Sequence, residues 1–199
     1  MIGVPALHAW VDESTRRRAS GTSVYVLAAT ICGTEQADEA RRSVRALRLP
    51  ELRFLHWHEE DRGRRLQIAT VISGLEALHT VVVGAPVEAA GPERARSRCL
   101  ARLATELAGI GVEHMLIEGR TALQNRRDVA TITDLRSHGA VPKPLTVDFA
   151  GKSDDPMLWI ADIVAGAVGA SLTGTDAEPL DALGPSVEVI RIGLTQRRR

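Results

Sequence analysis

Apolar and polar positions divide this 199-residue chain into segments with two different periods. Residues 7–12 alternate, which predicts a strand with Trp10 and Asp12 on one side. Residues 23–32 are apolar and rich in β-branched side chains, which predicts a second strand, joined to the first by a polar turn at 15–21. Shorter apolar runs predict further strands at residues 52–57, 79–87, 112–118 and 144–149.

The segments between these strands have apolar residues three and four positions apart, the spacing of helices. Predicted helices cover residues 35–47, 64–78, 92–109, 121–137 and 157–170. Asp155 is the expected N-cap of the last helix, followed by Pro156. Two early strands and then alternating helices and strands predict an α/β fold, a mixed sheet flanked by helices. We expect a single domain over residues 1–199, with a short C-terminal tail from about residue 187.

One charged residue interrupts the most apolar stretch of the chain. Asp162 lies in the middle of residues 157–170, which are otherwise apolar and predict a helix that is buried nearly all round. Desolvating an isolated carboxylate is costly, so Asp162 needs a partner, a proton or a cation. A face of Ala165, Gly166 and Gly169 would let this helix approach a sheet closely. The alternative is a buried aspartate that pairs with an arginine or caps a backbone group.

Two further acids are expected near Asp162, because each ends a predicted strand. Asp12 ends the first strand and Glu118 ends residues 112–118. Hard cations such as Mg²⁺ or Mn²⁺ prefer oxygen ligands, and one or two such ions can activate water against a phosphodiester. The pattern therefore predicts Asp12, Glu118 and Asp162 as catalytic groups and metal ligands. Two alternatives stay open, a turn role for Asp12 and a plain ion pair with Arg120 for Glu118.

A fourth carboxylate is expected from the acidic segment 58–61. We assign Glu60 as the fourth catalytic group and metal ligand, with Glu59 and Asp148 as alternatives. The chain has no Gly-x-Ser-x-Gly, no phosphate-binding Gly-x-x-x-x-Gly-Lys and no Gly-x-Gly-x-x-Gly. Serine hydrolases, P-loop proteins and dinucleotide-binding folds are accordingly disfavoured.

Two histidines flank Trp57, and on a strand both would point the same way. His56 and His58 are predicted to bind substrate phosphate, although a zinc site with a nearby acid, or packing beside Trp57, would use the same residues. Arg64 and Arg65 follow the acidic segment and are predicted to contact the substrate as well.

The charge of the chain sums to zero, which disfavours a globally basic nucleic-acid-binding protein. Its distribution is uneven, with eight acids and one lysine between Asp148 and Glu188. Of the 25 basic residues only Lys143 and Lys152 are lysines. Arginine suits bidentate contacts to phosphate, but a GC-rich genome would also produce this excess.

Neither a secretion signal nor a membrane span is predicted, and we expect a cytoplasmic protein. The apolar run 157–170 is too short for a span and is interrupted by Asp162. Hydrophobic residues make up 44% of the chain, enough for a substantial core. Cys32 and Cys99 have no metal-binding spacing and are expected to be buried apolar residues.

Three stretches resemble the bacterial domain-of-unknown-function family 3800, which is similar to the ribonuclease H-like superfamily. They are His-Ala-Trp-Val-Asp-Glu-Ser at 8–14, Leu-His-Trp at 55–57 and Pro-Met-Leu-Trp-Ile-Ala-Asp at 156–162. The resemblance implies a ribonuclease H-like fold, the layout already predicted. Trp159 stands where the family usually has glutamine, which removes a polar group, and Glu118 stands where aspartate is common.

These observations together predict a nuclease or phosphodiesterase that depends on Mg²⁺ or Mn²⁺ and acts on nucleic acid. The alternative is a ribonuclease H-like module without catalysis that binds nucleic acid or a protein partner. The apolar segment from Val187 could also pair with the edge strand of a second copy, which leaves a homodimer open.

Overall fold

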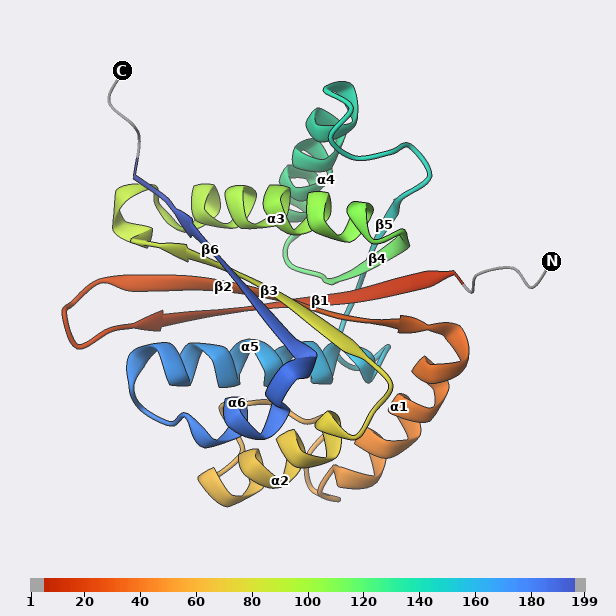
Figure 1. Ribbon diagram of the computed structural model, residues 1–199, viewed down its shortest axis with the longest axis vertical. Helices are drawn as coiled ribbons and strands as arrows, with labels where there is room; N and C mark the ends of the chain where they lie inside the picture. The colour runs from red at the N-terminus through yellow and green to blue at the C-terminus, as the bar shows by residue number, and fades with distance from the viewer. Residues whose placement is uncertain (1–5, 196–199) are drawn as a thin grey trace.

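Residues 6–195 are described by the structure, a computed structural model, and they contain a six-stranded mixed sheet. The strand order is β5-β4-β1-β2-β3-β6 (Figure 1). The strands are β1 (Leu7–Arg17), β2 (Ser23–Gly33), β3 (Leu78–Ala85), β4 (Val112–Glu118), β5 (Thr146–Ala150) and β6 (Val187–Gly193). The predicted mixed sheet is confirmed.

A long hairpin of β1 and β2 forms the centre of the sheet. The two strands pair antiparallel over their whole length, and Gly21 in the connecting turn has a φ of 84°. Glycine adopts this left-handed conformation without the steric strain that a Cβ would cause. β4 pairs parallel to β1 on its other side, and β5 pairs parallel to β4. The carboxyl ends of β4 and β5 therefore lie together at one end of these strands, beside the middle of β1.

Helices cover both faces of the sheet (Figure 1). On one face lie α1 (Thr34–Leu47), α2 (Arg62–Ser73), α5 (Met157–Thr173) and α6 (Glu178–Leu183), and on the other lie α3 (Pro92–Gly109) and α4 (Ala122–Ser137). β2 is therefore buried on both sides, which explains why it is apolar at nearly every position. Its residues Val24 and Val26 belong to the core under α5, whereas Tyr25 and Leu27 belong to the core under α3.

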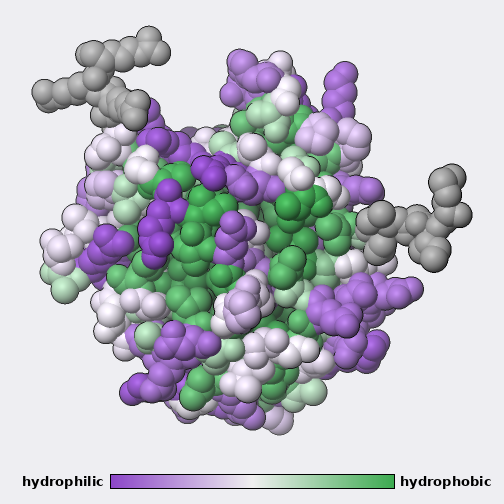
Figure 2. All heavy atoms as spheres, viewed as in Figure 1, coloured by the Kyte–Doolittle hydropathy of each residue, from purple (hydrophilic) through white to green (hydrophobic). Residues whose placement is uncertain are grey.

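α5 is the most buried helix of the structure. All residues from Met157 to Ala170 are buried, including Asp162, as the apolar run predicted. Asp155 accepts a hydrogen bond from the N–H of Met157 at 3.0 Å, the contact expected of a capping side chain. Figure 2 shows apolar residues gathered over the centre of the face where β6 crosses, with hydrophilic residues around its rim.

A buried histidine on β3 makes the stability of the fold sensitive to acid. His79 is 1% exposed, its Nδ1 lies 3.1 Å from Thr30 Oγ1, and burial lowers its pKa to about 4. The unfolded chain therefore binds a proton between about pH 6.5 and pH 4 that the folded protein does not.

We expect the free energy of unfolding to fall by about 3 kcal/mol as the pH decreases from 7 to 4, from this residue alone. The measurement is urea unfolding at a series of pH values, with His79→Asn as the variant that keeps a partner for Thr30. An equally steep loss of stability in the variant would show that other groups cause it.

Several predicted boundaries are wrong, for physical reasons that lie outside the local pattern. Residues 52–57 form a loop rather than a strand, because they pack between helices and have no strand to pair with. β1 continues to Arg17, so Asp12 lies within the strand and not at its end. The predicted C-terminal tail contains β6, which pairs parallel with β3, and α6 was not predicted. The terminal arginines 197–199 lie outside the described residues.

No helix within residues 6–195 is long and apolar enough to cross a membrane.

Candidate active site

Three carboxylates from different elements surround one lysine. Lys152 Nζ lies 3.0 Å from Asp12 Oδ2, 3.6 Å from Glu118 Oε2 and 2.9 Å from Asp162 Oδ1. Asp12 comes from β1, Glu118 from the end of β4 and Asp162 from α5. The structure thus brings together three of the four predicted acids, with an ammonium group among them.

The sheet register explains this convergence. Val11 of β1 pairs with Ile117 of β4, so the next residues of the two parallel strands, Asp12 and Glu118, lie side by side. Glu118 in turn pairs with Ala150 of β5, two residues before Lys152. α5 crosses the same face of β1 and carries Asp162 one to two turns from its start.

The backbone of Lys152 is fixed by a tryptophan. The indole Nε1 of Trp159 donates a 2.7 Å hydrogen bond to the carbonyl oxygen of Lys152. Lys152 is 8% exposed, and although burial opposes its charge, Asp12 and Asp162 raise the pKa of its ammonium group well above the usual range. Trp159 therefore supplies a polar contact to the site, contrary to the sequence-based expectation that it removes one.

Asp162 is fully engaged by its neighbours. Its Oδ2 accepts a 2.6 Å hydrogen bond from the backbone N–H of Trp57 and lies 3.0 Å from His56 Nδ1. Its Oδ1 accepts a 2.9 Å hydrogen bond from Lys152 Nζ. Burial opposes ionisation, but His56 and Lys152 outweigh it and hold the pKa of Asp162 below its usual value. The hydrogen bond between His56 and Asp162 raises the pKa of His56. Asp162 thus has the partners that a buried carboxylate requires, and it orients both His56 and Lys152.

Asp12 is in the opposite situation. It is 1% exposed, and its Oδ1 accepts the N–H of Glu13. Its Oδ2 is buried and makes no hydrogen bond with the described residues, although Lys152 lies beside it. Burial and the neighbouring carboxyl of Glu118 raise the pKa of Asp12 well above its usual value. Two neighbouring carboxyl groups favour a shared proton or a cation between them.

The cluster opens into a cavity of about 440 Å³. The cavity is lined by residues from β1, from the loop before α2, and from the cluster itself: Asp12, Glu13, Ser14, Thr15, Phe54, His56, Trp57, His58, Glu59, Glu118, Lys152 and Asp162. The rings of His56 and His58 are 5.5 Å apart at its wall. Both histidines thus face the cavity, although they come from a loop and not from a strand.

The remaining predicted site residues differ in their relation to the cavity. Glu60 is buried and its Oε2 accepts a 3.1 Å hydrogen bond from Arg64, so neither side chain lines the cavity. Arg65 stacks on Trp57. Of the alternatives for the fourth acid, Glu59 lines the cavity, whereas Asp148 is exposed on β5 and lies 3.0 Å from His114 of β4.

Lys152 is the residue that sequence reasoning missed. One signal was available, because Lys152 is the single basic residue in the acidic region from Asp148 to Glu188.

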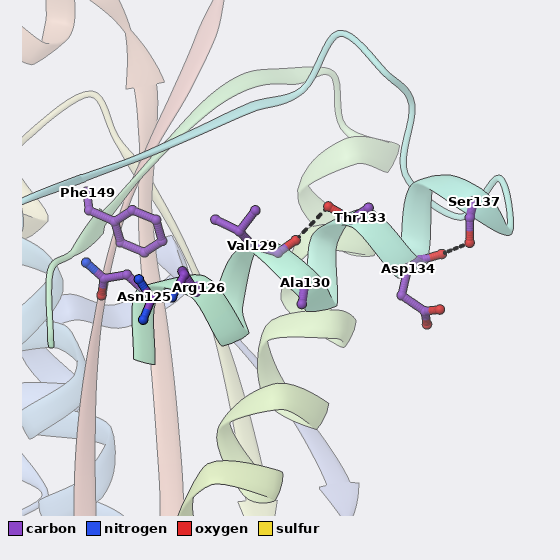
Figure 3. A pocket seen from close by; sticks show the side chains of 8 residues that line it. All are labelled: Asn125, Arg126, Val129, Ala130, Thr133, Asp134, Ser137 and Phe149. Atoms are coloured by element: carbon purple, nitrogen blue, oxygen red, sulfur yellow. Dashed lines mark hydrogen bonds between the residues drawn. The ribbon is translucent and has the colours of Figure 1, made fainter. Parts of the chain in front are cut away.

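A larger cavity of about 730 Å³ lies along α4 and β5 and shares no residue with the carboxylate cavity. Figure 3 shows Phe149 of β5 at one end of a row of α4 side chains that includes Val129 and Ala130. Its lining is mostly apolar and contains no group of converging acids. We therefore place the chemistry of the protein in the smaller cavity.

The architecture is similar to that of two solved structures. One is RNase HII in its complex with PCNA from Archaeoglobus fulgidus, with a TM-score of 0.53, 17% identity, and coverage of 79% of this chain and 69% of that one. The fold is ribonuclease H-like. The other is ribonuclease H2 from Pyrococcus horikoshii OT3, with a TM-score of 0.47, 13% identity, and coverage of 88% of this chain and 75% of that one. No protein-family model matches the sequence, and no curated protein does, so membership of family 3800 stays a prediction.

Proposed function

We propose that the protein is a phosphodiesterase that cleaves nucleic acid with the help of one Mg²⁺ or Mn²⁺ ion held by Asp12 and Glu118. The observation that carries this proposal is the pair of neighbouring carboxylates, Asp12 and Glu118, whose oxygens lie 3.0 Å and 3.6 Å from Lys152 Nζ. It lies at the wall of an open cavity, on a ribonuclease H-like fold.

The donor set fits such an ion. Asp12 Oδ2 is a buried oxygen without a hydrogen bond among the described residues, and carboxylate oxygens are the ligands that hard divalent cations prefer. Asp162 is less suited to this role, because its oxygens are occupied by His56, Lys152 and a backbone N–H. Within residues 6–195 no group of three histidine, cysteine or acidic side chains is arranged around a common metal position. In our proposal Asp12 and Glu118 are the protein ligands of the ion, with the ammonium group of Lys152 beside them.

A divalent cation bound at this position would act as a Lewis acid, which lowers the pKa of bound water and polarises a phosphoryl oxygen. The chain itself supplies the remaining charges. The ammonium of Lys152 stabilises negative charge that develops on the phosphate. His56, held through Nδ1 by Asp162, keeps Nε2 for a phosphate oxygen or for proton transfer to the leaving group. Glu60 and Arg64, which were predicted to act here, do not line the cavity and have no part in the proposed chemistry.

The test is cleavage of labelled RNA, single-stranded DNA, double-stranded DNA and an RNA–DNA hybrid, each with Mn²⁺ or with EDTA. We expect cleavage of at least one substrate with Mn²⁺ and none with EDTA. Absence of cleavage of all four substrates, together with no change in melting temperature on addition of Mn²⁺, would reject the proposal.

A second candidate is a module that binds nucleic acid or a protein without cleaving it. The observation in its favour is Lys152, which already neutralises part of the carboxylate cluster. In that case the protein would bind labelled nucleic acid in EDTA, and Mn²⁺ would change neither its affinity nor its stability.

Lys152→Met is expected to lower stability and to make it dependent on Mn²⁺. Removing one partner of a buried ion pair costs about 3–5 kcal/mol, because the other charges remain buried without compensation. Mn²⁺ should restore most of this loss by binding the freed carboxylates. Thermal unfolding in EDTA and in Mn²⁺ measures both effects. A variant that is as stable as the wild type in EDTA would show that Lys152 is not the resident cation of the cluster.

A further inference from the structure

Near the end of β1, the guanidinium group of Arg16 has no anionic partner. Its stem packs on α5 at Gly169, where an added Cβ would lie 2.8 Å from Arg16 Cγ. Its Nε and Nη2 are buried and donate no hydrogen bond to any residue between 6 and 195. Burial, and then the nearby charge of Arg65, lower the pKa of Arg16. Buried donors without acceptors are costly, so this position is suited to an anion that the chain does not provide.

Two further basic groups adjoin Arg16. Arg65 stacks on Trp57, with its guanidinium carbon 4.6 Å from the ring centroid, and its Nε donates a 3.0 Å hydrogen bond to the Trp57 carbonyl. His58 lines the carboxylate cavity together with Thr15. On α5, Gly166 meets Trp57 and Gly169 meets the stem of Arg16, so the tryptophan that carries Arg65 and the side chain of Arg16 pack about one helical turn apart. Arg16 follows Thr15 in the chain and Arg65 stacks on Trp57, so both arginines adjoin residues that line the cavity.

We propose that Arg16, Arg65 and His58 form a phosphate-binding subsite beside the carboxylate cavity, which holds the phosphate next to the one that is cleaved. Planar guanidinium groups match the geometry of phosphate oxygens and donate two hydrogen bonds at once. A bound phosphate would satisfy the buried donors of Arg16 and reduce the repulsion between the two arginines. The identity of the substrate rests on the proposed function, whereas phosphate binding at this subsite requires no metal ion.

The first test is thermal unfolding in EDTA with inorganic phosphate or with sodium chloride at equal ionic strength. Phosphate should raise the melting temperature of the wild type but not that of Arg16→Met, which keeps the stem against α5. In chloride, Arg16→Met should melt at a higher temperature than the wild type, because unpaired donors are removed. The control is Arg102→Met, at an exposed ion pair with Glu106 on α3. Equal stabilisation of wild type and Arg16→Met by phosphate would overturn the subsite.

The second test is binding of a labelled single-stranded oligonucleotide in EDTA, where no cleavage occurs. Arg16→Met should weaken binding about five- to tenfold and reduce the slope of log K against log salt by about 0.7, the value for one lost phosphate contact. Weaker binding by this variant, with no Mn²⁺-dependent cleavage by the wild type, would retain the subsite and reject the proposed nuclease. Cleavage by the wild type with unchanged binding by Arg16→Met would retain the nuclease and reject the subsite.

Discussion

Asp12→Asn is expected to reduce metal-dependent cleavage about 100-fold or more, since even residues that only support metal ligands commonly contribute 10- to 100-fold. The substitution keeps the shape of the side chain but removes the charge that would hold the ion. Because Glu118 and Asp162 still face Lys152 after this change, and an amide is cheaper to bury than a carboxylate, the variant should stay folded in EDTA.

Two measurements separate this loss from unfolding. Initial rates of cleavage give the effect on activity, and melting temperatures with and without Mn²⁺ give the effect on metal binding. The wild type should be stabilised by Mn²⁺ and Asp12→Asn should not. The matched control is Asp148→Asn, an exposed aspartate on β5 that does not line the cavity. Cleavage at the wild-type rate by Asp12→Asn would contradict the assignment of Asp12 as the principal ligand.

Gly166→Ala is expected to destabilise the protein by about 3 kcal/mol, at the upper end of what overpacking usually costs. A methyl group at Gly166 of α5 would overlap the indole ring of Trp57 and would lie 2.8 Å from its Cβ. Trp57 is 2% exposed and cannot move aside, since it packs inside the core. Its displacement would also shift the backbone N–H that binds Asp162.

Urea unfolding measures this change, and for a chain of this size about 3 kcal/mol corresponds to about 6–12 °C in melting temperature. The matched control is Gly109→Ala near the end of α3, where an added Cβ meets nothing within 4 Å. There the same substitution should be neutral or stabilising, because alanine favours the helix. Equal effects at the two glycines would show that helix propensity, and not the contact with Trp57, determines the result.

The small-residue face of α5 shows what a local sequence pattern can predict about packing and what it cannot. The spacing of Ala165, Gly166 and Gly169 predicted a close approach to another element, and the structure contains such approaches. The partners could not be predicted, because Trp57 comes from a loop and Arg16 from the end of β1. Both contacts depend on how distant segments pack.

The residues of the candidate site could likewise be predicted only in part. Asp12, Glu118 and Asp162 could be selected from sequence, because each is an acid attached to a strongly apolar segment. Glu60 was selected only as one of several acids in the segment 58–61, and that segment forms a loop in which the Glu60 side chain binds Arg64. Lys152 could not be placed, since its position depends on the pairing of β5 with β4 and on the Trp159 hydrogen bond.

By itself, the sequence determined the central secondary structure and the buried character of Asp162, because hydrophobic periodicity and the cost of burying charge act locally. Pro92–Gly109 and Val112–Glu118 were predicted to the residue. Only the tertiary structure decided that Asp162 binds His56 and Lys152, and that Asp12 and Glu118 lie side by side next to the same lysine. Asp162 and His56, like Asp12 and Glu118, are more than a hundred positions apart in the sequence, and their distances depend on strand register and helix packing.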